Sequence, residues 1–431
     1  MIQVLSSAWA LLLGLGLLTV GNGLQTTVLG LRGEMEGFST LDMSFIILAY
    51  YAGFLGGSRA APELIRRVGH VRVFAALASG ISAVMIVYPV LPEPVVWILG
   101  RALVGFCFSG VYVVAESWLN NAADNANRGK ALSLYMAVMM IGMISSQGLV
   151  LVSDPGGYVG FVIASVLVSI SFTPILLSIS PTPPFDTTKP MPLKTLFKVS
   201  PLGCVGTFMV GGVISAQYGM AAVFGAVAQL TVAEISIFIA MFYVGALLMQ
   251  FPLGWMSDRV DRRMLILALS LLGGGAAIAG YALGDSFAVL LVVAFLSGGT
   301  ANPLYSLLIA YTNDYLGHED MAAASGGLLF LNGLGASVGP LLVGWLMGPA
   351  VLGPAGYFVY MAVLMVALAV YAAYRATQRA AVPVEETGAM MAVTAITSPI
   401  AVEVAQEVVI EAELEAAEEA AQEEQSAAGS S

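Results

Sequence analysis

Charge is the scarcest property of this sequence. Charged residues make up 10% and hydrophobic residues 58% of its 431 positions, whereas soluble proteins average about 25% and 45–50%. Because the apolar excess is spread along most of the chain, it excludes a soluble globular protein and predicts one that crosses a membrane many times. The only two cysteines, Cys107 and Cys204, both lie inside apolar runs. We therefore expect neither a disulfide nor a metal site.

The sequence also lacks the patterns that enzymes show. It has no nucleophile paired with a base, no cluster of metal ligands and no phosphate-binding loop. We expect no enzymatic activity, no catalytic residue, no cofactor and no nucleic-acid partner. The N-terminus has no basic residue before its apolar run, which favours a first spanning helix that is retained over a cleaved signal peptide.

What remains is a series of long apolar segments separated by short turns. A spanning helix needs about 20 apolar residues, and the chain up to Arg379 has room for twelve. We predict an all-α membrane protein with helices over residues 5–30, 40–59, 71–91, 94–119, 129–152 and 157–180, and then over 202–228, 232–257, 263–283, 286–312, 320–346 and 354–376.

Basic residues are confined to alternate turns of this arrangement. With twelve spans, 14 of the 16 Lys and Arg residues fall on one side. The opposite face has only Arg32, and Arg101 lies within a helix. The positive-inside rule makes the basic side cytoplasmic and places both termini there. The basic residues of that side are Arg59, Arg66, Arg67, Arg72, Arg128, Lys130, Lys189, Lys194, Lys198, Arg259, Arg262, Arg263, Arg375 and Arg379.

The turn after the eighth span carries a recognisable spacing, Gly254-x-x-x-Asp258-Arg259-x-x-Arg262-Arg263. It resembles the loop signature of the major facilitator superfamily of transporters, and a related stretch around Arg66 occupies the matching place in the first half. The resemblance implies two pseudo-symmetric six-helix bundles. The domains would be an N-terminal bundle at 1–180, a cytoplasmic connector at 181–200, a C-terminal bundle at 201–378 and a tail at 379–431.

Within that superfamily the chain is similar to the bacterial YcaD-like branch. The likeness covers about residues 5–378, and no firm substrate follows from it. It is carried by the strings Gly21-Asn22-Gly23-Leu24-Gln25, Gly69-His70-Val71-Arg72, Ala115-Glu116-Ser117-Trp118-Leu119-Asn120, Arg128-Gly129 and Gly335-x-x-x-Gly339-Pro340.

The resemblance also implies a charged gate between the halves on the cytoplasmic side. The family's acidic loop residue would place Asp258 near Arg128, and Arg66, which stands where the first half should have an acid, would face an acidic loop. Such pairs would favour the cytoplasm-closed state; the alternative is that these charges are topology signals and solvated loop ends. Glu116, at the cytoplasmic end of its helix, would join this gate. The candidate gate residues are Arg66, Arg67, Glu116, Arg128, Asp258, Arg262, Asp314 and Glu319.

Family architecture places helices 1, 4, 7 and 10 around a central cavity, and their polar side chains become candidate contacts for a substrate. Arg101 is the only embedded basic residue among them. It would bind an anion or take part in proton coupling, or it would snorkel to the interface or bond to backbone carbonyls. The absence of a fixed acid suits a neutral, zwitterionic or anionic solute. The candidates are Asn22, Gln25, Arg101, Tyr112, Gln217, Tyr218, Asn302 and Tyr305.

The formal net charge of −11 belongs to the tail. Up to Arg379 the chain is neutral, and 11 acids with no Lys or Arg follow between Glu385 and Glu424. We expect a mostly disordered, solvated appendage, with docking to a basic partner as the alternative.

These observations predict a secondary active or facilitative transporter of a small solute. It would act by alternating access in a bacterial inner membrane, as a monomer in the lipid bilayer, with proton coupling left open. The competing interpretation is a non-transporting membrane scaffold or assembly factor of the same fold that acts through its acidic tail.

Overall fold

The computed structural model describes residues 2–122, 125–174, 190–384, 387–394, 397–398 and 400–411. All regular elements in these ranges are helices. The first half contains α1 (Ile2–Met35), α2 (Thr40–Val68), α3 (His70–Val90), α4 (Pro94–Ala122), α5 (Asn125–Val152) and α6 (Val159–Ser171). The second contains α8 (Leu193–Val199), α9 (Pro201–Ser215), the π-helix η1 (Ala216–Met220), α10 (Ala221–Val227), α11 (Val232–Ser257), α12 (Arg262–Leu283), α13 (Phe287–Asn313), α14 (His318–Leu346) and α15 (Ala355–Gln378).

Most of these helices have the length and composition of membrane spans. Among the described residues, 11 helices are long and apolar enough to cross a bilayer, with α9, η1 and α10 together forming one of them. At 1.5 Å per residue, a helix of 27 residues such as α13 is about 40 Å long, which exceeds the roughly 30 Å hydrocarbon layer. The predicted sixth span, 157–180, is described only in part, because residues 175–180 lie outside the described residues.

Local chemistry sets several helix starts. The hydroxyl of Ser39 accepts a hydrogen bond from the Asp42 backbone N–H at the start of α2, and the carboxylate of Asp42 accepts one from the Ser39 backbone in return. Thr231 and Glu234 form the same reciprocal cap at the start of α11. Such capping boxes satisfy backbone N–H groups that have no partner within the helix. They place the turns sharply, so that long helices can run antiparallel.

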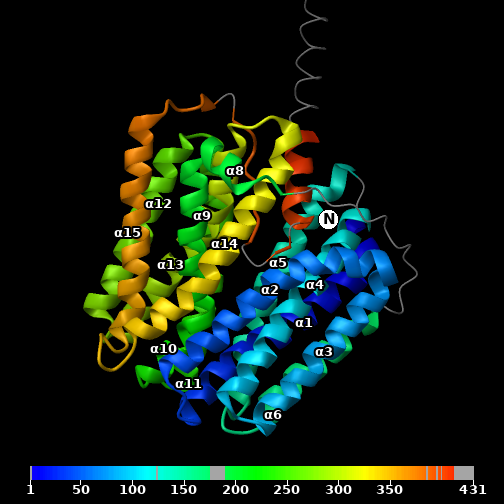
Figure 1. Cartoon of the computed structure of the whole chain (residues 1–431), viewed down its shortest axis with the longest axis vertical. Helices are drawn as coiled ribbons and strands as arrows, with labels where there is room; N and C mark the ends of the chain where they lie inside the picture. The colour runs from blue at the N-terminus through cyan, green and yellow to red at the C-terminus, as the bar shows by residue number, and fades with distance from the viewer. Residues whose placement is uncertain are drawn as a thin grey trace, which may run out of the picture.

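The two halves repeat the same internal packing. In Figure 1 the blue-to-cyan helices α1 to α6 form one bundle and the green-to-orange helices α9 to α15 form the other. The helix pair α2–α4 packs most extensively in the first half, and the corresponding pair α11–α13 does so in the second. In both pairs the backbones meet at glycine. A Cβ atom at Gly105 would overlap the carbonyl oxygen of Tyr50, and one at Gly298 would overlap that of Phe242.

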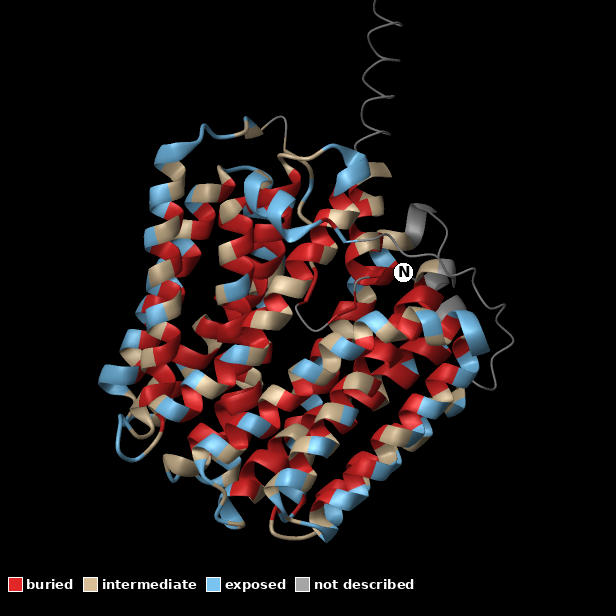
Figure 2. Cartoon of the chain, in the orientation of Figure 1, coloured by how far each residue is buried: buried red, intermediate tan, exposed pale blue. Residues whose placement is uncertain are grey.

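The outer surface of the bundle is apolar. Large hydrophobic side chains such as Val152, Phe251 and Val370 are 73%, 66% and 66% exposed, and exposed patches alternate with buried ones along the helices in Figure 2. A soluble protein would bury this surface, whereas a bilayer solvates it. The all-helical membrane fold predicted from the sequence is confirmed.

The chain after α15 differs from the solvated appendage that we expected. We call the described residues 387–394, 397–398 and 400–411 the C-terminal segment; it runs between the two bundles and ends in a helix at 400–411, the red helix of Figure 1. Val404 and Ala405 are 6% and 0% exposed. The expectation failed for these residues because their apolar side chains have a binding surface that only the two assembled bundles create. Residues 412–431 lie outside the described residues.

We predict that Gly105→Ala destabilises the protein. The added methyl group would overlap a backbone carbonyl that cannot move without shifting α2, at a cost of about 1–3 kcal/mol. Thermal unfolding in detergent measures the effect. Gly275→Ala is the matched control, because no atom outside the adjoining backbone of its own helix lies within 4 Å of its added Cβ; equal unfolding temperatures for the two variants would refute the close-packing argument.

Candidate functional site

A small cavity lies between the two bundles, near the middle of the helices. Its volume is about 40 Å³, which has room for about three waters, since each needs roughly 10–15 Å³. It is lined by Asn22, Gly23, Thr26 and Thr27 of α1, Tyr50 and Tyr51 of α2, Arg101 and Tyr112 of α4, Met143 and Gln147 of α5, Tyr218 and Gly219 of η1, and Ile239 and Tyr243 of α11.

Arg101 supplies the only positive charge among these described lining residues. Its side chain is 2% exposed, and its Nη1 donates a hydrogen bond to Gln25 Oε1 at 3.0 Å. Its guanidinium lies 4.5 Å from the centre of the Tyr50 ring. No carboxylate among the described residues lies within ion-pair distance of it, and its Nε has no hydrogen-bond partner there. A buried cation in this state attracts an anion or a strong hydrogen-bond acceptor.

Three neighbouring polar atoms are also unsatisfied. Asn22 Oδ1, Gln25 Nε2 and the Tyr112 hydroxyl are buried and have no hydrogen-bond partner among the described residues. Buried polar groups are normally paired, with protein or with water. Together with Arg101 they therefore form a patch that both donates and accepts hydrogen bonds, all of it on α1 and α4.

The facing wall, from the second bundle, is mainly aromatic. The rings of Tyr218 and Tyr243 stack with their centres 4.4 Å apart and their planes 9° apart. Asn302 Nδ2 donates to the Tyr218 hydroxyl at 2.6 Å. Tyr218 lies on η1, and π-helical turns within α-helices often occur at functional sites.

The eight candidates from the sequence divide into three groups. Asn22, Arg101, Tyr112 and Tyr218 line the cavity, and Gln25 and Asn302 bond to residues that line it. Gln217 instead bridges helices through Ser297 at 3.0 Å, and Tyr305 is buried outside the lining.

Sequence reasoning missed part of the lining. It considered helices 1, 4, 7 and 10, whereas α2, α5 and α11 contribute Tyr50, Tyr51, Gln147 and Tyr243. Gln147 accepts a hydrogen bond from the Thr27 hydroxyl at 3.2 Å. A polar side chain in an otherwise apolar run, that of Gln147, was the available signal.

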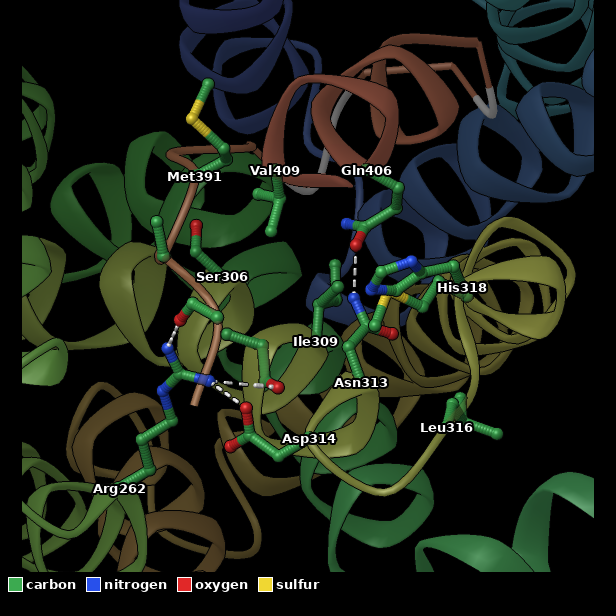
Figure 3. Close-up of a pocket in the computed structure, with 14 residues that line it drawn as sticks. Arg262, Ser306, Ile309, Asn313, Asp314, Leu316, His318, Met391, Gln406 and Val409 are labelled. Carbon is green, nitrogen blue, oxygen red and sulfur yellow. Dashed lines mark hydrogen bonds and ion pairs between the residues drawn. The ribbon is translucent and has the colours of Figure 1, made fainter. Parts of the chain in front are cut away.

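The end of the bundle that carries most of the basic residues, which we call the basic end, has a buried ion pair. Arg262 and Asp314 have side chains 3% and 4% exposed and bond to each other. Arg262 also donates to the Gly388 carbonyl oxygen of the C-terminal segment. A carboxylate oxygen of Asp258 lies 3.7 Å from Arg262 Nη2. Figure 3 shows the bond between Arg262 and Asp314 at the edge of a second cavity of about 140 Å³. The segment therefore forms hydrogen bonds with the loop at 254–263, in which Asp258 and Arg262 belong to the spacing that resembles the loop signature.

Glu116 and Arg128, in the first bundle, also contact the segment. Glu116 is 2% exposed and accepts hydrogen bonds from the Tyr135 hydroxyl at 2.6 Å and from the Ser398 backbone N–H at 3.1 Å. Arg128 Nη1 lies 3.1 Å from a carboxylate oxygen of Glu407. Burial raises the pKa of Glu407, with Arg128 opposing that shift.

The remaining candidate gate residues form no ion pair between the two bundles among the described residues. Arg66 and Arg67 both pair with Glu63 on their own helix, at 2.9 and 2.7 Å. Glu319 lies in the first turn of α14. Asp258 accepts a hydrogen bond from the Met390 backbone rather than from Arg128. The gate was predicted for a state in which the two bundles meet at the basic end. In this structure the C-terminal segment lies between them there. The gate therefore stays a prediction.

The comparisons with known proteins agree with this geometry. The family model described as "Major Facilitator Superfamily" matches residues 203–411, and the model described as "Sugar (and other) transporter" matches residues 16–184. The chain belongs to the major facilitator superfamily.

Curated relatives of this chain are named as transporters, and solved transporter structures share its fold. The chain is 26% identical over 353 residues to the "Uncharacterized MFS-type transporter YcaD" of Escherichia coli, covering 78% of this chain and 88% of the relative. Its fold is similar to a mutant of the nucleoside transporter NupG, with a TM-score of 0.73, 14% identity and coverage of 85% and 99%. A bacterial homologue of the human lysosomal transporter Spinster, in an inward-facing and occupied conformation, has a TM-score of 0.69, 16% identity and coverage of 87% and 97%.

Membership in the superfamily makes this chain a multi-pass membrane transporter and not an enzyme. Members carry small-molecule substrates across the bilayer. The likeness to the YcaD relatives agrees with the branch that the sequence strings indicated.

Proposed function

We propose that this protein moves a small polar solute across a bacterial cytoplasmic membrane by alternating access, as a secondary active or facilitative transporter. The observation that carries the proposal is the unsatisfied patch around Arg101, which lies between two bundles that repeat the same packing. A polar patch at the middle of a bilayer is costly unless a solute or water fills it. Two similar bundles can tilt about such a site.

The chemistry of the lining narrows the solute class. Arg101 Nε and Gln25 Nε2 offer unused donors, and Tyr218 and Tyr243 present aromatic faces. Among the described lining residues there is no Asp, Glu or His, so a cationic solute has no counter-charge. We propose a neutral, zwitterionic or anionic solute with several acceptor oxygens. The nucleoside named for one structural neighbour and the sugar named for one family model are of this polar, uncharged kind.

The present arrangement corresponds to one of the two states of alternating access, in which the bundles meet at one end and are separated at the other. At the end opposite the basic end, the Thr40 hydroxyl of α2 donates to the Gly344 carbonyl of α14 at 2.9 Å, which joins the two bundles. At the basic end they are held apart by the C-terminal segment. We propose that closure of the basic end brings Asp258 to Arg128, with Arg66 facing the acidic start of α14.

A scaffold that acts through an acidic tail is the second candidate. The described part of the tail argues against it, since Glu407 and Glu411 lie 3.1 and 3.6 Å from Arg128 and so already pair with a basic residue of the same chain. Each chain contains both bundles and a cavity between them, so we propose that a monomer suffices. Any proton coupling would involve Glu116, which lies one helical turn from Tyr112.

We predict that Arg101→Lys weakens solute binding by about 10- to 100-fold, because a guanidinium bonds to acceptors in a geometry that an ammonium cannot reproduce. A thermal-shift screen of the purified protein against a metabolite library identifies the solute, and counterflow in proteoliposomes measures its transport. Arg32→Lys is the control, since Arg32 pairs with Glu36 away from the cavity. A scaffold would move none of the solutes that bind.

Sidedness is tested by cysteine labelling in cells, in a background without Cys107 and Cys204. Arg67→Cys and Arg259→Cys should both resist a membrane-impermeant maleimide, because the basic end faces the cytoplasm. Tyr158→Cys, at a residue 68% exposed at the opposite end, should react. Labelling of one basic-end position but not the other would refute the topology.

The gate is tested by exchanging charges. Asp258→Arg and Arg128→Asp should each slow counterflow of the solute identified above, because each places like charges together in the closed state. The double variant restores the pair with opposite polarity and should recover much of the rate. A double variant no faster than either single one would show that the two residues do not pair.

A further inference from the structure

The C-terminal segment contacts both bundles on the surfaces that face each other. In the second bundle, the Ser306 hydroxyl of α13 donates to the Val393 carbonyl at 2.8 Å and accepts from the Val393 N–H at 3.1 Å. In the first bundle, the Thr394 hydroxyl lies 3.7 Å from the Met136 sulfur of α5. Two adjacent residues of the segment therefore reach opposite bundles.

The segment lies directly between the central cavity and the basic end. Ser306 follows Asn302 by four residues on α13, and Glu116 follows Tyr112 by four on α4. Four residues are about one helical turn, a rise of roughly 6 Å, and residues four apart share a helix face. The segment therefore contacts the same faces that reach the cavity, one turn farther toward the basic end.

Glu116 fixes the innermost part of the segment. Its carboxylate accepts hydrogen bonds from the backbone N–H groups of Ser398 and Ala401, at 3.1 and 3.2 Å, and from the Ser398 hydroxyl. These groups lie at the start of the helix at 400–411, where backbone N–H groups have no partner within the helix and the dipole favours an anion. A buried carboxylate of the transporter thus caps a helix of its own tail.

The helix itself packs between the two bundles. Val402, Val404 and Ala405 are 1%, 6% and 0% exposed, and Gln406 accepts a hydrogen bond from Asn313 Nδ2 of α13. At its outer turns Glu407 and Glu411 flank Arg128. Three apolar side chains of the helix are thus buried between the bundles, and two of its acids pair with a basic residue of the first bundle.

We propose that the C-terminal segment is a built-in plug, which closes the path between the central cavity and the basic end and must withdraw before a solute can pass. The plug rests on the proposed function, because it closes a path that only a transporter needs. While inserted, it also keeps the bundles apart at the basic end and so holds the protein in one state.

The rate at which a cavity thiol reacts with a small reagent tests the proposal. Met143→Cys places a thiol in the cavity lining, in a background in which Cys107 and Cys204 are replaced by alanine. The probe is the anionic reagent 2-sulfonatoethyl methanethiosulfonate, applied to purified protein. We expect a chain that ends at Arg379 to react at least about tenfold faster than the full chain, since several hydrogen bonds that hold the plug are lost.

A reference thiol controls for general loosening of the fold. Thr195→Cys, at an exposed position of α8 near the same end, should react at the same rate in the full and shortened chains. Equal rates for the Met143→Cys thiol in the two chains, or a full chain in which that thiol reacts as fast as the exposed one, would overturn the plug.

A point variant tests the plug without shortening the chain. Glu116→Gln presents an amide N–H₂ group to backbone donors and should release the segment, raising the Met143→Cys rate by about tenfold. Glu63→Gln is the matched control, because Glu63 lies at the same end and, among the described residues, forms its ion pairs with Arg66 and Arg67 of its own helix. If Glu116→Gln leaves the rate unchanged, Glu116 does not hold a plug.

The outcomes separate the plug from the transport proposal. Labelling needs no knowledge of the solute, so a faster reaction after release of the segment supports the plug even if no solute binds. If instead a solute binds and is transported while the thiol rates stay equal, the transporter stands and the plug falls.

Discussion

A charge is far less stable in hydrocarbon than in water, and the arrangement of this chain follows from that difference. Nearly all of the described basic residues lie at one end of the bundle, where they are solvated by water or, like Arg262, paired with a carboxylate. Arg101 is the exception. It is buried with a neutral amide and a tyrosine ring as neighbours, and with no carboxylate among the described residues to balance it. The cavity beside it is lined by amides, hydroxyls and tyrosine rings, with no acid among its described lining residues, and it is too small in this state for more than a few waters.

How far the sequence predicts this structure depends on whether a feature is local. The spans, the basic end and the internal repeat follow from apolar runs and charge spacing, which each segment carries in its own residues. The cavity could be predicted only in part. Asn22 and Arg101 were identified as polar residues in apolar helices, but whether their polar atoms find hydrogen-bond partners depends on which helices face them. Tyr50 and Tyr243 gave no signal that distinguished them from ordinary packing aromatics.

The tail could not be predicted because its partner is not in the tail. Its acids and lack of basic residues are typical of a solvated chain. Val404 and Ala405 are apolar in the same stretch, but they need a groove to pack in, and that groove exists only when α4 and α5 face α13. Glu116 shows the same dependence. Its position near the end of α4 was predicted, whereas its binding of a backbone 282 residues later in the chain was not.

The segment is joined to α15 by only the few residues between Arg379 and Thr387, and that short connection has a consequence of its own. A short covalent tether confines a ligand to an effective concentration of roughly millimolar near its site. Contacts that would give a free peptide a Kd of about 1 mM, or roughly −4 kcal/mol, are then enough to keep the site about half filled. The fraction of molecules with the segment bound then does not depend on the concentration of the protein in the membrane. Because this fraction is near one half, modest changes in the affinity of the contacts change it strongly.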